Sequence, residues 1–157
     1  DKFNYKMKSV ALVIIFSVLL ASCGFKSIYS SKNSNFEVID IVNKNENKNS
    51  FFIEKTVMAI SNNEAQKKLK LEIDYQQLIT TVLKDSKGDP SKNKLLIKVN
   101  LNVKDQEDKV LTNKVFTEEF NYNVQTNKFE MSQYVENISE NLNKKISNDI
   151  IFLLATL

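Results

Sequence analysis

The residue with the clearest chemistry is Cys23, the only cysteine among the 157 residues of the chain. It directly follows Leu20-Ala21-Ser22 and the apolar run 10–20, and lysines precede that run. A basic start, an apolar core and small residues before a cleavage point are typical of a secretory signal. Because a spanning helix needs about 20 apolar residues, this shorter run favours an export signal over an anchor helix.

The cleavage region resembles the lipobox of bacterial lipoproteins, in which the cysteine sulfur receives a diacylglycerol and the new amine receives an acyl chain. We therefore predict that Cys23 is a lipidation site. Residues 1–22 are then the signal peptide, with Met7 as the expected start, and residues 23–35 are the lipidated cysteine and a linker. One acyl chain binds a membrane only marginally, at about 0.8 kcal/mol per buried methylene. The several chains of a lipobox cysteine would give stable contact with a membrane.

The residue inventory excludes most catalytic sites. The chain has no histidine and no second thiol, so it lacks the parts of a Ser-His or Cys-His nucleophile and of a His/Cys zinc site. Its two glycines, Gly24 and Gly88, cannot build a phosphate-binding loop. The adjacent acids Glu118 and Glu119 would point to opposite faces of a strand, and we interpret them as exposed acids. We expect no enzyme activity, no metal and no cofactor.

Charge excludes a further class of partner. Every basic residue is lysine and the net charge is only +3, so forked arginine recognition of phosphate is unavailable. No nucleic-acid partner is expected. The mild positive balance is compatible with anionic headgroups or acidic glycans, and a mixed solvated surface explains it equally well.

Residues 36–157 have the pattern of a single domain. Residues 36–42 are rich in β-branched and aromatic types and predict a first strand. Ser50 can cap a helix over about 50–62. Strict alternation then predicts three long strands: 69–75, which 78–83 prolongs through a bulge, 95–103 after a loop at 86–93, and 109–124. From about Glu130, apolar residues at intervals of three or four predict a long amphipathic helix.

This order of elements predicts an α+β fold, a two-layer sandwich in which two helices pack on one face of a four-stranded, mostly antiparallel sheet. The three long strands must form an antiparallel meander because their connections are too short for a parallel crossover. The apolar stripe of the last helix should pack against the sheet. Its tail, residues 150–154, is more apolar than one sheet face can bury, which leaves a membrane or barrel contact open there.

With these elements in place the chain resembles the LPS-assembly lipoprotein family, LptE. The opening Cys23-Gly24-Phe25-Lys26, with Tyr29 soon after, is similar to the start of that family's mature chains. Further similarities are the helix after a polar loop, and Lys109-Val110-Leu111 leading to Phe120-Asn121-Tyr122-Asn123. The last is the final helix with Asn148-Asp149-Ile150 before its apolar end. Ser30 stands where a glycine often follows the opening tyrosine.

The resemblance implies an outer-membrane lipoprotein on the periplasmic face. Such a protein plugs the LptD-like β-barrel translocon, helps it to assemble, and assists insertion of lipopolysaccharide into the outer leaflet. Gly24 after the cysteine resembles the sorting pattern of outer-membrane lipoproteins. Two other functions stay open: an accessory lipoprotein of a lipid-transport ABC system, and an activator of a cell-wall synthase.

Replacing the thiol tests the lipidation site. We expect Cys23→Ala to accumulate as uncleaved precursor without acyl label, because only a thiol can form the thioether. Metabolic labelling with a tagged fatty acid and intact-mass analysis measure both effects. Normal labelling of the variant would contradict the assignment.

Overall fold

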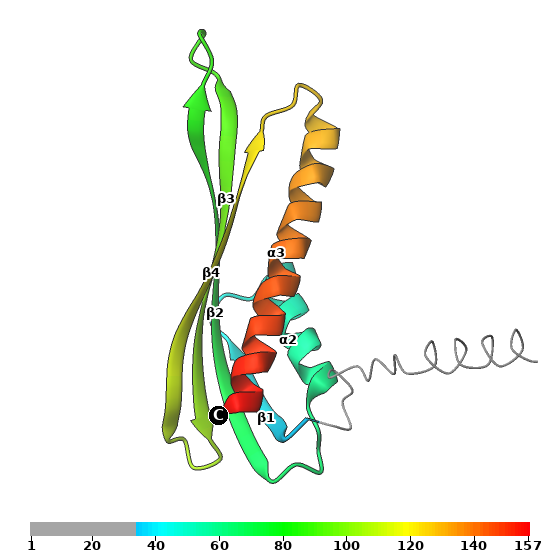
Figure 1. The fold of residues 1–157 in the computed structure, drawn as a ribbon, viewed down its shortest axis with the longest axis vertical. Helices are drawn as coiled ribbons and strands as arrows, with labels where there is room; N and C mark the ends of the chain where they lie inside the picture. The colour runs from blue at the N-terminus through cyan, green and yellow to red at the C-terminus, as the bar shows by residue number, and fades with distance from the viewer. Residues whose placement is uncertain (1–33) are drawn as a thin grey trace, which may run out of the picture.

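A computed structural model of the chain describes residues 34–157 (Figure 1). The predicted signal peptide, Cys23 and the predicted linker up to residue 33 lie outside the described residues. The elements follow in the order β1 (Phe36–Asn43), α2 (Lys48–Ile60), β2 (Lys67–Lys84), β3 (Pro90–Asp105), β4 (Val110–Asn123) and α3 (Lys128–Thr156). This is the order that the sequence predicts.

The sheet has the strand order β1-β2-β3-β4. β1 runs parallel to β2, whereas β2, β3 and β4 form an antiparallel meander. Both helices lie against the same face of this sheet, α2 beside the C-terminal half of α3 (Figure 1). The predicted α+β sandwich with a four-stranded, mostly antiparallel sheet is therefore confirmed. We call the face under the helices the inner face and the opposite one the outer face.

Helix α2 begins earlier than predicted. Its N-cap is Asn47, whose side-chain oxygen accepts hydrogen bonds from the backbone N–H groups of Asn49 and Ser50 at 2.9 and 3.0 Å. The Ser50 hydroxyl accepts in turn from the Asn47 N–H at 3.0 Å, which completes a capping box. Ser50 is thus the third helical residue and not the cap. Asparagine and serine cap almost equally well, so their types alone do not separate these two registers.

The β2–β3 hairpin is longer and more regular than predicted. β2 is continuous over 18 residues, and its register irregularities fall beyond Thr81 rather than near Gln77. The predicted loop 86–93 shrinks to a turn, because the Asp85 carboxylate accepts from the N–H groups of Lys87 and Asp89, both at 2.9 Å. Gly88 supplies the positive φ of 89° that this turn requires.

Strand β4 contributes fewer buried side chains to the core than the shared face of its even-numbered residues suggests. Phe116 and Tyr122 are buried, whereas Phe120, on the same face, remains 43% exposed and Val124 is also exposed. β4 is the last strand of the sheet, and among the described helices only α3 packs against it. One helix is too narrow to cover every inward side chain of an edge strand.

The hydrophobic core is divided into two unequal parts. The large part joins β1, α2, the lower half of β2, β3, Phe116 of β4 and the C-terminal half of α3. The small part contains Leu95, Tyr122 and Ile138, with Met131 and Val135 packed beside them. Figure 1 shows why: α2 lies beside the lower sheet only, while the β2–β3 hairpin continues past the first turn of α3.

The apolar end of α3 is mostly used inside the protein. Ile150, Ile151 and Leu154 are buried in the large core and Leu153 packs against it, because α2 and the sheet together surround this end of the helix. Only Phe152 of the tail stays largely exposed, at 69%. The expected surplus of apolar surface is thus reduced to one side chain. Within residues 34–157, no helix has the length and apolar character needed to cross a bilayer.

A matched pair of variants tests whether Ile150 is buried and Phe152 is exposed at this end of α3. Ile150→Ala should lower the free energy of unfolding by about 2–5 kcal/mol, because it leaves a cavity in the core. Phe152→Ala should change it by less than about 0.5 kcal/mol, as expected for an exposed position. Urea unfolding followed by circular dichroism measures both. Equal losses would show that Phe152 is as buried as Ile150.

Candidate functional site

The outer face of the sheet is its most extensive polar surface. Alternation places the even-numbered residues of β2 and β3 and the odd-numbered residues of β4 on it. Most of them carry charges, amides or hydroxyls: Lys70, Glu72, Asp74, Gln76, Lys94, Lys98, Asn100, Asn102, Lys104, Asn113, Thr117, Glu119 and Asn121. Since both helices lie on the other face, no helix of the described residues covers this surface.

Hydrogen bonds across the strands order this surface. Asn100 Nδ2 donates to the Asp74 carboxylate at 3.1 Å, and Asn102 Nδ2 donates to Glu72 at 3.2 Å. Lys104 Nζ binds the other Glu72 oxygen at 2.5 Å. The outer face is therefore a set of fixed hydrogen-bonding groups rather than a collection of free side chains.

The ion pairs on this face shift pKa values in opposite directions. The hydrogen bonds from Lys104 and then Asn102 hold the pKa of Glu72 below its usual value. The hydrogen bond to Glu72 raises the pKa of Lys104. Beyond them, the hydrogen bond from Lys70, at 2.8 Å, lowers the pKa of Asp108. These carboxylates stay ionised at neutral pH, so they act as structural charges and not as proton donors.

Glu118 and Glu119 point to opposite faces, as predicted. Glu118 pairs with Lys145 of α3 at 2.8 Å on the inner side, and Glu119 pairs with Lys94 of β3 at 3.3 Å on the outer side. The interpretation of both as exposed acids is wrong for Glu118, whose side chain is only 19% exposed because α3 lies over it. The two carboxylates are thus separated by the sheet and cannot act together as an acid–base pair.

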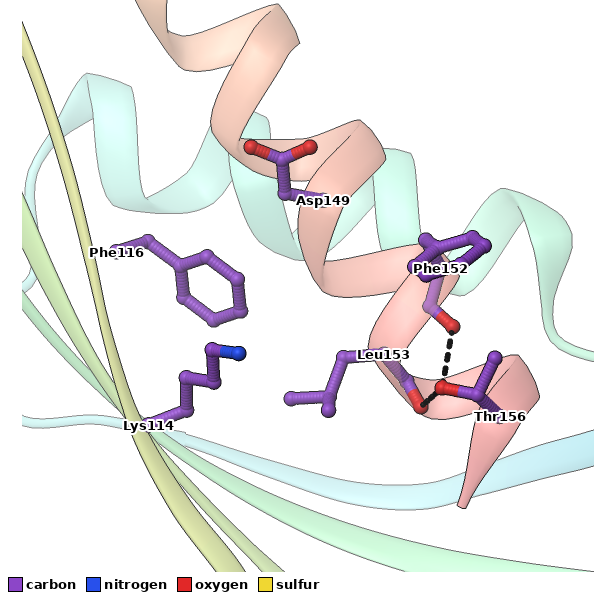
Figure 2. A pocket seen from close by; sticks show the side chains of 6 residues that line it. All are labelled: Lys114, Phe116, Asp149, Phe152, Leu153 and Thr156. Atoms are coloured by element: carbon purple, nitrogen blue, oxygen red, sulfur yellow. Dashed lines mark hydrogen bonds between the residues drawn. The ribbon is translucent and has the colours of Figure 1, made fainter.

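A recess of about 370 Å³ lies between β4 and the end of α3 (Figure 2). Lys114 and Phe116 project into it from β4, and Asp149, Phe152, Leu153 and Thr156 line it from α3. The Thr156 hydroxyl is bonded to the carbonyls of Phe152 and Leu153 at 3.0 and 2.9 Å. The recess therefore combines aromatic and aliphatic contacts with one basic and one acidic side chain, while its hydroxyl is bound within the helix.

A polar seam lies where the two parts of the core meet, between the exposed side chain of Gln77 and the buried Tyr75 and Ser139. The Gln77 side-chain oxygen accepts from the Tyr75 hydroxyl at 3.0 Å, from Asn49 of α2 at 2.9 Å and from Ser139 of α3 at 3.2 Å. Burial raises the pKa of Tyr75, so its hydroxyl remains a donor. This seam links α2, β2 and α3 through one side chain.

Sequence reasoning missed this seam because it placed the polar residues of the last helix on the outside. The structure buries Ser139, Asn143 and Ser147, which follow one another at intervals of four. That spacing keeps the three on one helix face, and it was the available signal.

A second, apolar groove opens at the upper end, where the hairpin extends beyond the helices. Its lining comes from the tip half of β2, the end of β4 and the first turns of α3, with Ile79, Tyr122, Val124, Met131 and Val135 as its apolar side chains. Its volume is about 520 Å³. Among residues 34–157 no group of three or more acidic side chains could hold a metal ion.

The Glu72 cluster predicts a pH dependence of stability. Because the folded pKa of Glu72 is depressed, its contribution is present above the unfolded pKa of about 4.3 and is lost as the pH falls through the folded value. We expect Glu72→Gln to reduce stability at pH 7 and to flatten the acid limb of the stability curve. Chemical unfolding between pH 7 and pH 3 measures this. A parallel curve for Glu72→Gln would contradict the assigned cause, and Glu46→Gln, a change at an exposed loop acid, serves as control.

Comparison with protein-family models and with curated proteins finds no match for this chain. Solved structures do match. The rare lipoprotein B of Shewanella oneidensis superposes with a TM-score of 0.59 at 10% identity, over 76% of this chain and 94% of that one. A minor lipoprotein of Acinetobacter baumannii gives 0.59 at 10%, over 83% and 94%. Lipoprotein B of Nitrosomonas europaea gives 0.59 at 12%, over 84% and 90%. At such low identity the likeness establishes the fold: this chain has the architecture found in several bacterial lipoproteins.

Proposed function

We propose that this chain is an outer-membrane lipoprotein that plugs the lipopolysaccharide translocon barrel. It helps the barrel to assemble and assists insertion of lipopolysaccharide into the outer leaflet. It has no catalytic role in this proposal. Its working parts are a lipid anchor at Cys23 and a compact domain inserted in the barrel lumen.

The polar outer face carries this proposal. The interior of a large membrane barrel is polar and filled with water. A domain that fits there must expose hydrogen-bonding groups along its length, as the outer face does from Lys70 and Lys104 to Asn121. Its ordered pairs, such as Asn102 with Glu72, would keep that surface fixed against a barrel wall. The fold shared with bacterial lipoproteins and the lipobox at Cys23 support the same conclusion.

The place where the described chain begins supports an orientation of the domain with its lower end toward the membrane anchor. Asn35 Nδ2 donates to the Ala155 carbonyl at 2.9 Å, and Lys67 Nζ donates to the Leu154 carbonyl at 3.1 Å. The start of the described chain therefore lies at the lower end, beside the end of α3. The residues between Cys23 and Ser34 can span at most about 40 Å. A lipid on Cys23 would thus keep the lower end near the inner leaflet, while the hairpin tip lies about 60 Å farther along β2.

Affinity purification tests this function directly. We expect the tagged, lipidated protein in mild detergent to recover an outer-membrane β-barrel. A photo-reactive residue at Thr117 or Asn113 of the outer face should cross-link to that barrel, because both positions are on β4 and would face its wall. Mass spectrometry identifies the adduct, and the untagged protein is the control.

Two results would contradict the proposal. Recovery of an ATPase complex without a barrel would indicate an adaptor of a lipid-transport ABC system. Recovery of a cell-wall synthase would indicate a synthase activator. In either case the outer-face cross-links would go to that partner instead.

A further inference from the structure

The upper half of β2 is an open edge of the sheet. β1 pairs with β2 only as far as Asn43 opposite Ile73, and the last bond on that side joins the Lys44 N–H to the Ile73 carbonyl at 2.8 Å. Within residues 34–157 no strand continues along this side of β2. We call residues 76–83 the open edge.

The backbone of the open edge has groups ready to pair. The Ile73 carbonyl faces the β1 side, and backbone groups of successive strand residues point alternately to the two sides. Gln77 and Ile79 therefore direct their N–H and C=O groups away from β3, toward the open side. Such an unpaired row is a template for another strand.

Charge separates the open edge from the other free edges of this sheet. β1 carries Glu37 and Asp40, and β4 carries Lys114, Glu118 and Glu119. Charged residues of this kind normally prevent strands of other chains from adding to an edge. The open edge reads QQLITTVL and has no charge, proline or glycine. Four of its side chains are aliphatic and about half exposed, with exposed fractions between 45 and 56%: Leu78, Ile79, Val82 and Leu83.

The groove beside the open edge adds a place for side chains. Ile79 forms part of its wall from β2, and Met131 and Val135 form the facing wall from α3. A strand added to the open edge would direct every second side chain toward this inner side. Edge hydrogen bonds combined with a pocket for alternate side chains are the two elements of recognition by strand addition.

We propose that the open edge binds an extended segment of another polypeptide by strand addition. The segment is uncharged over about eight residues to match the open edge, with aliphatic or aromatic side chains at alternate positions that enter the groove. The inference goes beyond the proposed function, since it requires a partner strand of this chemistry and not a particular partner protein.

A second copy of this chain fits less well. Eight strand residues extend about 26 Å, so a contact about 10 Å wide buries only about 260 Å² per partner. A stable dimer interface buries about 800 Å² per partner. Pairing of two open edges is thus too small to hold two copies together, whereas a peptide that also fills the groove gains further apolar contact.

Hydrogen exchange on the full-length, lipidated protein in detergent micelles tests the proposal. The probe is an end-blocked peptide of about ten residues, alternating valine and threonine, chosen for high strand propensity. We expect it to slow amide exchange at Gln77 and Ile79 about tenfold. Ile79→Lys should weaken its affinity about tenfold, and the same peptide with a central proline should not bind, because proline removes a donor.

Val115→Lys is the matched control. Val115 lies on the edge strand β4 and is 50% exposed, compared with 47% for Ile79, so its replacement adds the same charge at a similar position. We expect unchanged peptide affinity. Circular dichroism verifies that both variants fold. If Ile79→Lys does not fold, Leu83→Lys is tested in its place.

Three outcomes would overturn the proposal. The first is unchanged exchange at Gln77 and Ile79 with saturating peptide. The second is an equal loss of affinity in Val115→Lys. The third is sedimentation of the protein alone as a dimer that Ile79→Lys dissociates, which would make a second copy the occupant.

Discussion

The alternation of apolar and polar side chains along β2 and β3 is the constraint on which the rest of this structure depends. Leu71 and Leu101 must be covered, so two helices from distant parts of the chain have to lie on one face. The same alternation directs Glu72, Asn100 and Asn102 to the other face, where they hydrogen-bond across the strands. One pattern thus produces both the core and the polar surface on which the proposed plug function rests.

A mismatch in length between the two layers produces the apolar groove and the open edge. The 13 residues of α2 extend about 20 Å and the 29 residues of α3 about 43 Å, whereas the 18 residues of β2 extend about 60 Å. The helices therefore cannot cover the whole inner face. The polar seam at Gln77 marks the place beyond which α2 no longer covers the inner face together with α3. The groove and the open edge lie beyond that place. A fully covered sheet would have had no such site.

These features bear on the proposed function. The described surfaces include ordered polar groups on one face, an uncharged strand edge with an apolar groove beside it, and a recess whose hydroxyl is bound within α3. The entry of the chain beside Ala155 puts the end nearest Cys23 opposite the hairpin tip. A predicted tether at one end and a proposed strand-binding edge at the other would suit a protein that holds two parts of an assembly together, which is what the proposed function requires.

The sequence by itself determined the order of the elements, the fold class and the inward residues of β2 and β3, because strict alternation and intervals of three or four leave one consistent arrangement. It also supplied the interpretation of Cys23, which stays a prediction. It did not separate Asn47 from Ser50 as the cap, since both types cap well, and it did not reveal the burial of Ser139 and Asn143. The tertiary structure alone decided which part of β2 lacks a neighbour. Strand pairing depends on where β1 ends in space, and no local pattern in residues 76–83 records that end.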